Sequence, residues 1–259
     1  MKQLLYSVIS AFSAFSVLPM PQIEWRQEYM RGLLSSLPLV GAVIGAFGCL
    51  YFALSSLLQL PAILSAVVLT LLPVVLSGGI HMDGFADTID ALSSHAAPEK
   101  KRAILKDPHT GAFAIIGVVS YLLLYFGLCA ALPLHWRQIL LLGLTHVLSR
   151  AVGALASVTL PGSSREGMLH MFSDGAARSS SVILLLWAAV TLAAMALLSP
   201  AASALSALGA VCVFCYLKRM SAREFGGMSG DLAGYCITIT AIVLLLGLVL
   251  AERITTLWF

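Results

Sequence analysis

Charged side chains are scarce in this sequence. Asp, Glu, Lys and Arg together make up 10 % of its 259 residues, whereas soluble globular domains average about 25 %. Hydrophobic residues account for 59 % and gather in long runs along the whole chain. This composition excludes an ordinary soluble domain and is typical of a helical membrane protein. The net charge of only +3 gives no reason to expect nucleic acid as a partner.

Paired cysteines and long polar linkers are also lacking. The five cysteines are an odd number and all lie in apolar segments, which argues against a disulfide framework. Cys212 and Cys215 form a CxxC pair without a second pair, so we interpret both as small hydrophobic residues. No polar stretch is long enough to separate two domains. We therefore expect residues 1–259 to form one integral membrane domain.

Eight apolar runs are candidates for membrane-spanning helices, which need about 20 residues each. They cover residues 4–18, 33–58, 62–77, 112–132, 139–160, 182–198, 202–217 and 232–251. The first and third runs are short, and the first can lie in the interface instead of crossing. The sequence thus predicts an all-α polytopic membrane protein with seven to eight transmembrane helices.

Basic residues are unequally shared between the two sides that eight spans define. The loops at 19–32, 78–111, 161–181 and 218–231 hold 11 of the 15 Lys and Arg residues. The opposite side holds 3, and Arg150 falls inside a span. By the positive-inside rule the first side is cytoplasmic. We expect a multi-pass protein of the cell membrane whose polar loops face the cytoplasm.

The most informative stretch is residues 77–111, which contains five of the 12 acidic residues. If this part is helical, a step of about 100° per residue places Asp83, Asp87 and Asp90 within about 60° on one face. Three like charges repel unless a cation neutralises them, and oxygen ligands suit Mg²⁺. The pattern predicts a Mg²⁺ site at these three aspartates. The alternative is a solvated acidic face near a helix start.

Further polar side chains flank this cluster. His81 is either a base or phosphate ligand, or an interfacial histidine held by the backbone. Lys106, Asp107 and Thr110 precede the next apolar run, and we expect Lys106 and Asp107 to contact substrate. The basic cluster at residues 100–102 is interpreted as an anchor to anionic lipid, with substrate contact as the alternative.

Two later features complete the polar inventory. Arg150 inside a span needs a carboxylate or a phosphate as its partner. Gly226, Gly227 and Ser229 predict a tight turn whose N–H groups hold an anion at a helix start. Asp231 belongs to this site or is an N-cap. Residues 163–167 and 172–174 are polar with weaker signals. Acids, cations and a glycine turn together favour group transfer at a diphosphate.

At these residues the sequence resembles the cobalamin synthase family, the adenosylcobinamide-GDP ribazoletransferases. The resemblance rests on residues 78–91 (GGIHMDGFADTIDA) and 105–112 (LKDPHTGA). Residues 149–150 (SR) and 226–231 (GGMSGD) support it. Near the N-terminus, Val17 and Leu18 stand where many members have arginine and isoleucine.

The resemblance implies a Mg²⁺-dependent membrane transferase. In it, the 3′-hydroxyl of α-ribazole, or of α-ribazole 5′-phosphate, attacks the phosphorus nearer cobinamide in adenosylcobinamide-GDP, and GMP leaves. The preferred acceptor, the number of metal ions and the oligomeric state stay open, a homo-oligomer included. We assign the roles as a hypothesis: His81, Asp83 and Asp107 are catalytic, Asp83, Asp87 and Asp90 bind metal, and Lys106, Thr110, Arg150, Gly226, Gly227, Ser229 and Asp231 bind substrate.

Three other classes show weaker similarity. CDP-alcohol phosphotransferases resemble the sequence at Asp83-Gly84, but the arginine that usually follows the alanine is Asp87 here. Membrane prenyltransferases resemble it at two aspartates four residues apart, which is too brief to be specific. A transporter is the alternative from another class, but its usual related halves are not found, because the aspartate motif occurs once.

Overall fold

The computed structural model describes residues 2–24, 26–30, 32–163 and 178–258, in which helices are joined by short loops. The predicted all-α class is confirmed. In chain order the elements are α1 (Lys2–Phe15), α2 (Gln27–Met30), α3 (Leu33–Leu57), α4 (Ala62–Leu76), α5 (Ile80–Ser93), α6 (Pro98–Ile104), α7 (Ala112–Ala131), α8 (Trp136–Thr159), α10 (Arg178–Leu198), α11 (Pro200–Met220), the π-helical turn η1 (Ser221–Phe225) and α12 (Gly230–Trp258).

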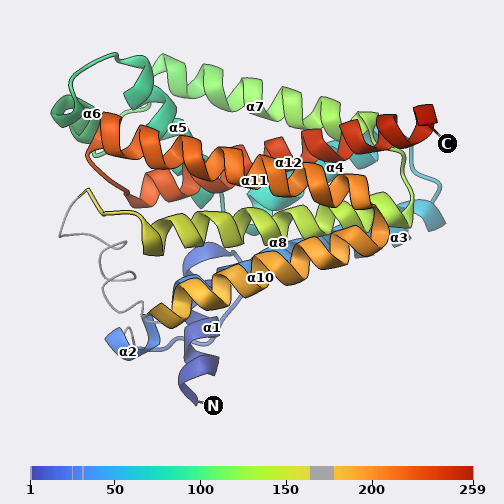
Figure 1. Ribbon diagram of the computed structural model, residues 1–259, viewed down its shortest axis with the longest axis horizontal. Helices are drawn as coiled ribbons and strands as arrows, with labels where there is room; N and C mark the ends of the chain where they lie inside the picture. Colours follow the sequence, from blue (N-terminus) through green and yellow to red (C-terminus); the bar gives the residue numbers. More distant parts are fainter. Residues whose placement is uncertain (1, 25, 31, 164–177, 259) are drawn as a thin grey trace.

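Six of these helices, α3, α7, α8, α10, α11 and α12, are long and apolar enough to cross a membrane. They run side by side along the long axis of the molecule (Figure 1). The 24 residues of α8 extend roughly 36 Å, which exceeds a hydrocarbon core of about 30 Å. Most of α8 and α12 is buried, whereas α7 and α10 expose apolar side chains outward. The protein is therefore a multi-pass membrane protein with a packed centre and a lipid-facing surround.

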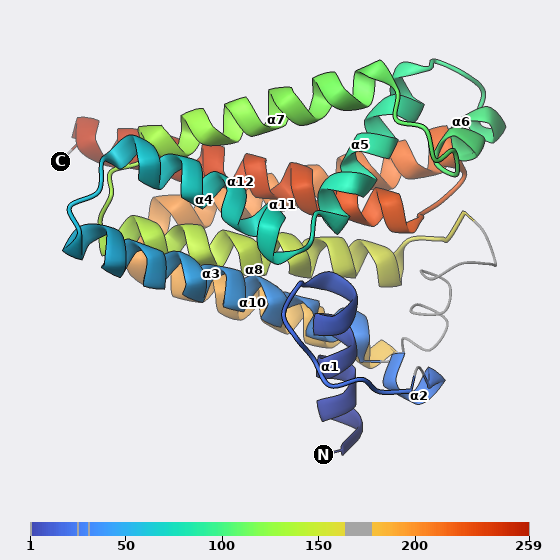
Figure 2. The same cartoon turned by 180° about the vertical axis from the view of Figure 1, so that it is seen from behind.

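A sharp bend separates α4 from α5. The two helices meet at 90°, and they count as a seventh span only if the bent pair is taken together. Gly78 and Gly79 lie between them with φ of +63° and +76°, a backbone region that glycine enters at little cost. The bend turns α5 away from the bundle axis at the end where α6 lies (Figure 2). The bend therefore sets the position of α5, the helix that carries the predicted acid cluster.

The first apolar run forms α1, which has only 14 residues. It is too short to be among the candidate spans, and it projects from the side of the bundle in Figures 1 and 2. Its buried face packs on α3 through Phe12 and its neighbours. The structure thus supports six or seven spans, and the first run is not one of them.

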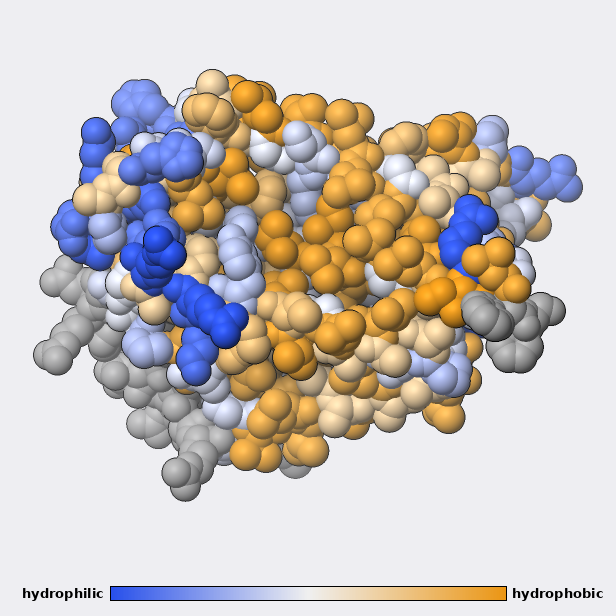
Figure 3. Space-filling view, turned by 45° about the horizontal axis from the view of Figure 1, so that its top comes forward, coloured by the Kyte–Doolittle hydropathy of each residue, from blue (hydrophilic) through white to orange (hydrophobic). Residues whose placement is uncertain are grey.

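Polar side chains gather at one end of the bundle. Figure 3 shows a large hydrophilic group at the left, a smaller one at the right and an apolar band between them. The left end carries α5, α6, the end of α8 and the turn from α11 to α12 (Figure 1). The described parts of the loops at 78–111, 161–181 and 218–231 therefore lie together, since Gly162 pairs with Met228 and α6 contacts η1. We call this end the polar end.

Candidate active site

Helix α5 carries the predicted acid cluster. It is helical from Ile80 to Ser93, as the one-face argument required, so Asp83, Asp87 and Asp90 follow one another along one side of it. Asp83 is exposed, and the other two are half-buried. Both Asp83 and Asp90 lie close enough to Asp87 to repel it electrostatically. We call this side of α5 the acid face.

A fourth carboxylate joins the acid face from α12. At Gly84, α5 and α12 are in backbone contact, because a Cβ there would lie 2.7 Å from the carbonyl oxygen of Asp231. Asp231 consequently acts electrostatically on Asp87, and Asp83 acts on Asp231. From the sequence, Asp231 was assigned to the glycine turn, and its approach to Asp83 and Asp87 was not predicted. The only local signal for it was the small residue at position 84.

The four carboxylates offer the oxygen ligands that Mg²⁺ prefers, but they do not by themselves surround a metal ion. Among the residues that the structure describes, no three His, Cys, Asp or Glu side chains form a group that could hold a metal ion. None of the four acids has a cation as ion-pair partner within that part of the chain. Mg²⁺ commonly takes one or two carboxylates and completes its shell with water and substrate phosphate. The donor set therefore fits this ion, and the site at Asp83, Asp87 and Asp90 stays a prediction.

The loop between α6 and α7 approaches the acid face. A Cβ at Gly111 would overlap the Asp90 carboxylate, so the second sequence motif touches the first. Lys106, Asp107 and Thr110 are exposed on this loop. The backbone N–H of His109 donates to the Asp107 carboxylate at 2.9 Å and its ring Nδ1 lies 2.7 Å away. These contacts lower the pKa of Asp107, which keeps it ionised at neutral pH.

His81 does not lie beside the carboxylates. It is about 160° around α5 from Asp83 at 100° per residue, and it is buried. Its ring stacks on Phe15 at 5.8 Å, and its Nε2 has no hydrogen-bond partner among the described residues. The charged side chain that acts on it electrostatically is Arg150. The structure therefore places His81 with the interior cation and not with the acid face.

Arg150 is buried in the centre of the bundle, at 2 % exposure. Its Nη1 donates to the backbone oxygen of His146 at 3.2 Å, and Tyr121 and Tyr125 are its electrostatic neighbours. No carboxylate pairs with it in the described part of the chain. The alternative of an ion pair with the acid cluster is thus not found there.

Unpartnered polar atoms concentrate around this arginine. Within the described ranges, buried atoms without a hydrogen bond include Nε2 of His81, the hydroxyl of Tyr125, Nδ1 of His146 and Nε of Arg150. Buried polar groups are normally bonded, so such a group is a place for water or a ligand. The interior centre is cationic, whereas the acid face is anionic.

The glycine turn before α12 has a structural role of its own. The N–H groups of Gly226 and Gly227 donate to the carbonyl of Ser221, and that of Met228 donates to Pro161. These donors are therefore not free to hold an anion. Ser229 accepts from the N–H of Leu232 at 3.2 Å and caps α12, so the cap is not Asp231. Substrate contact by Gly226, Gly227 and Ser229 stays a prediction.

The basic cluster after α5 differs from the expected lipid anchor. Lys101 is buried and donates to Glu224 of η1, while Arg102 donates to the carbonyl of Phe225 at 3.0 Å. Only Lys100 is fully exposed. We call the contacts of Lys101 and Arg102 the α6–η1 clamp. The weaker polar segments at 164–167 and 172–174 lie outside the described residues.

A helical membrane bundle with a cluster of uncompensated acids at one end is the arrangement expected of a membrane-embedded enzyme with a polar substrate. Residues 7–249 match the family of cobalamin-5-phosphate synthases. The chain belongs to this family, and the resemblance drawn from the motifs is confirmed.

Relatives match this chain over nearly its full length. A protein of Lachnoclostridium phytofermentans is 39 % identical over 251 residues, which cover 96 % of this chain and 95 % of the relative. One of Pseudomonas paraeruginosa is 32 % identical over 253 residues, covering 96 % and 100 %. One of Clostridium botulinum strain Alaska E43 is 29 % identical over 244 residues, covering 94 % and 96 %. All three are named adenosylcobinamide-GDP ribazoletransferase. No solved structure matches the chain.

Proposed function

We propose that this chain is an adenosylcobinamide-GDP ribazoletransferase of cobalamin biosynthesis and that its acid face is the reaction centre. The observation that carries the proposal is the convergence of four carboxylates from α5 and α12, without a cationic partner among the described residues. Mutual repulsion raises the free energy of such a cluster when all its members are ionised, and a bound cation would relieve that repulsion. Its family and its relatives supply the reaction.

The proposed substrates are adenosylcobinamide-GDP and α-ribazole or α-ribazole 5′-phosphate. The 3′-hydroxyl oxygen of the ribazole forms a bond to the phosphorus nearer cobinamide. The bond from that phosphorus to the bridging oxygen breaks, and GMP leaves with the electron pair. Positioning and charge stabilisation account for most catalysis in reactions of this type.

Asp83, Asp87 and Asp90 would hold Mg²⁺, with Asp231 beside them. When bound, Mg²⁺ neutralises the carboxylates and stabilises the charge that develops on the diphosphate oxygens. The four carboxylates would also keep the ion at a fixed place on α5, where the loop of Lys106 and Thr110 can reach the same phosphates.

Asp107 is the proposed base for the ribazole hydroxyl. It lies on the loop that touches Asp90 and is exposed there, so its carboxylate can contact a substrate hydroxyl. The hydrogen bonds from His109 lower its pKa and so weaken it as a base, and they would have to be released for the proton transfer. His81 was the other candidate, but it faces Arg150 instead of the acid face.

Lys106 is the proposed phosphate contact at the acid face, since it is not paired with a carboxylate in the described part of the chain. Arg150 also lacks a carboxylate partner there, but it lies with His81 in the interior centre. Its proposed substrate contact is therefore a second one, away from the acid face.

We also propose that the polar end faces the cytoplasm, where nucleotide substrates are found. The excess of Lys and Arg in the loops of this end supports that orientation.

The test is release of GMP from adenosylcobinamide-GDP and α-ribazole by the purified protein in detergent, with and without Mg²⁺. We expect GMP and a cobalamin product in equal amounts with Mg²⁺, and a loss of turnover after chelation that added Mg²⁺ reverses. Absence of GMP under every metal condition would refute the function. Full turnover in excess chelator would refute the metal role alone.

A further inference from the structure

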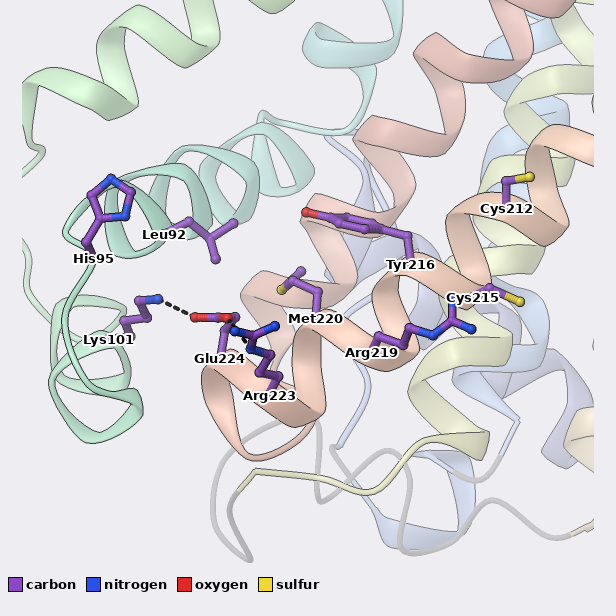
Figure 4. A pocket seen from close by; sticks show the side chains of 10 residues that line it. All are labelled: Leu92, His95, Lys101, Cys212, Cys215, Tyr216, Arg219, Met220, Arg223 and Glu224. Carbon is purple, nitrogen blue, oxygen red and sulfur yellow. Dashed lines mark hydrogen bonds and ion pairs between the residues drawn. The ribbon is translucent and has the colours of Figure 1, made fainter.

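A cavity of about 660 Å³ lies at the polar end between α5, α6, α11 and η1 (Figure 4). Its volume falls in the range of about 300–1,000 Å³ that is usual for small-molecule sites. It is separate from the acid face, because the lining residue Leu92 lies about 180° around α5 from Asp83. None of the residues assigned above to the reaction lines it.

The lining of this cavity is cationic. Lys101, Arg219 and Arg223 line it, together with a single carboxylate, that of Glu224. This carboxylate pairs with Lys101 and lies 3.4 Å from Arg223, as Figure 4 shows. Arg219 stands apart from that group, beside Cys215, and has no ion pair within the described residues. Three cations against one acid leave the cavity complementary to an anion.

The cavity opens onto the lipid-facing side of α11. Leu208 and Val211 are each 61 % exposed, and Cys215 and Arg219 continue the same face at steps of four residues. Tyr216 reaches from this face into the cavity (Figure 4). This face of α11, which we call the apolar stripe, therefore carries Leu208 and Val211 at membrane depth and ends at the guanidinium group of Arg219 at the polar end.

We propose that this cavity binds the phosphate headgroup of an anionic phospholipid, with an acyl chain along the apolar stripe of α11. A guanidinium group binds phosphate oxygens in a bidentate manner, and that of Arg219 has no ion pair among the described residues. Arg223, beside Glu224, adds a second positive charge to the lining. The apolar continuation distinguishes a lipid from a soluble phosphate, which needs no path into the bilayer. The headgroup would sit beside the Lys101–Glu224 pair and so would hold α6 and η1 in place.

The test measures lipid binding to the purified full-length protein in detergent by native mass spectrometry, with no substrate present. Phosphatidylglycerol and phosphatidylcholine are titrated against the native protein and two double variants. Arg219→Gln/Arg223→Gln removes two lining cations. Lys100→Gln/Lys218→Gln is the matched control, since it removes the same charge from exposed positions outside the cavity.

We expect phosphatidylglycerol to bind the native protein and the control variant, and to bind Arg219→Gln/Arg223→Gln about thirtyfold more weakly. An equal loss in the control would overturn the proposal in favour of general surface charge. Equal binding of phosphatidylcholine would exclude headgroup recognition. Displacement of the lipid by inorganic phosphate or GMP would identify a soluble-anion site instead.

If the double variant does not stay monodisperse, Arg219→Gln alone removes the cation that has no ion pair in the described chain. We expect it to weaken phosphatidylglycerol binding about fivefold, and unchanged binding would refute the site. The GMP-release assay is run on the same samples, so that a failure of the lipid site and a failure of the transferase function give different results.

Discussion

The two ends of the bundle treat their carboxylates differently. At the end away from the polar loops, Glu252 accepts from Arg137 at 2.7 Å and from Gln138 at 2.5 Å, so its charge is compensated by its neighbours. At the polar end, Asp83, Asp87, Asp90 and Asp231 lie near one another, and none of them has a cation as partner among the described residues. An acid with an ion-pair partner links neighbouring helices, whereas a cluster of acids without one attracts a cation from outside the chain.

This contrast separates structural from functional charge within one protein. The α6–η1 clamp belongs with the compensated group, since Lys101 and Glu224 neutralise each other. The acid face and the interior centre at Arg150 are of opposite sign and each lacks such a partner in the described chain. The variants below test whether this division holds.

The largest effect is expected from Asp83→Asn, which removes one charge from the acid face with almost no change in shape. Turnover in the GMP-release assay should fall by at least about 100-fold, while membrane insertion and melting temperature stay close to native. Glu99→Gln is the matched control, because Glu99 is an exposed acid of α6 outside the acid face. Near-native activity of Asp83→Asn would show that the uncompensated charge of the acid face is not needed for turnover.

An intermediate effect is expected from Gly111→Ala. The φ of −80° at Gly111 suits alanine, so only the overlap with the Asp90 carboxylate acts on the site. Displacing this carboxylate should lower kcat by about 10- to 100-fold. Gly127→Ala lies within α7, the helix that Gly111 precedes; a Cβ there meets nothing within 4 Å, so this variant should leave kcat unchanged. Equal activities of the two variants would show that Asp90 need not be held.

The smallest effects are expected where charge is compensated. Glu224→Gln leaves the buried Lys101 without its partner, so the melting temperature should drop clearly, and kcat should drop less than in Asp83→Asn. Glu252→Gln at the far end breaks a half-exposed pair, which contributes about 0.2–1 kcal/mol, and turnover should stay native. Calorimetry and the GMP assay on both variants check the ranking. A far-end variant that abolished turnover would contradict it.

Much of this arrangement could be predicted from sequence because it depends on local patterns. The apolar runs predicted the helices, and the spacing of Asp83, Asp87 and Asp90 predicted their shared face once α5 was helical. The membrane class and the acid face thus followed from periodicity and composition.

Other features depend on contacts between distant parts of the chain and left little local signal in the sequence. Asp231 reaches the acid face only because α12 packs on Gly84. His81 was grouped with the acids by proximity in sequence, but the helical turn points it inward. The N–H groups of the glycine turn were expected to be free, and they are occupied by Ser221 and Pro161. Local spacing cannot specify such partners, since tertiary packing selects them.

The α6–η1 clamp joins Lys101 to Glu224 and Arg102 to Phe225, residues that are each 123 positions apart. During synthesis, the ribosome therefore delivers the acidic helix long before the segment that fastens it, and Asp231 emerges later still. A nascent chain halted after α8 would contain the aspartate motif but neither Glu224 nor Asp231. We therefore expect enzymatic activity to arise in a single late step, when α12 is inserted.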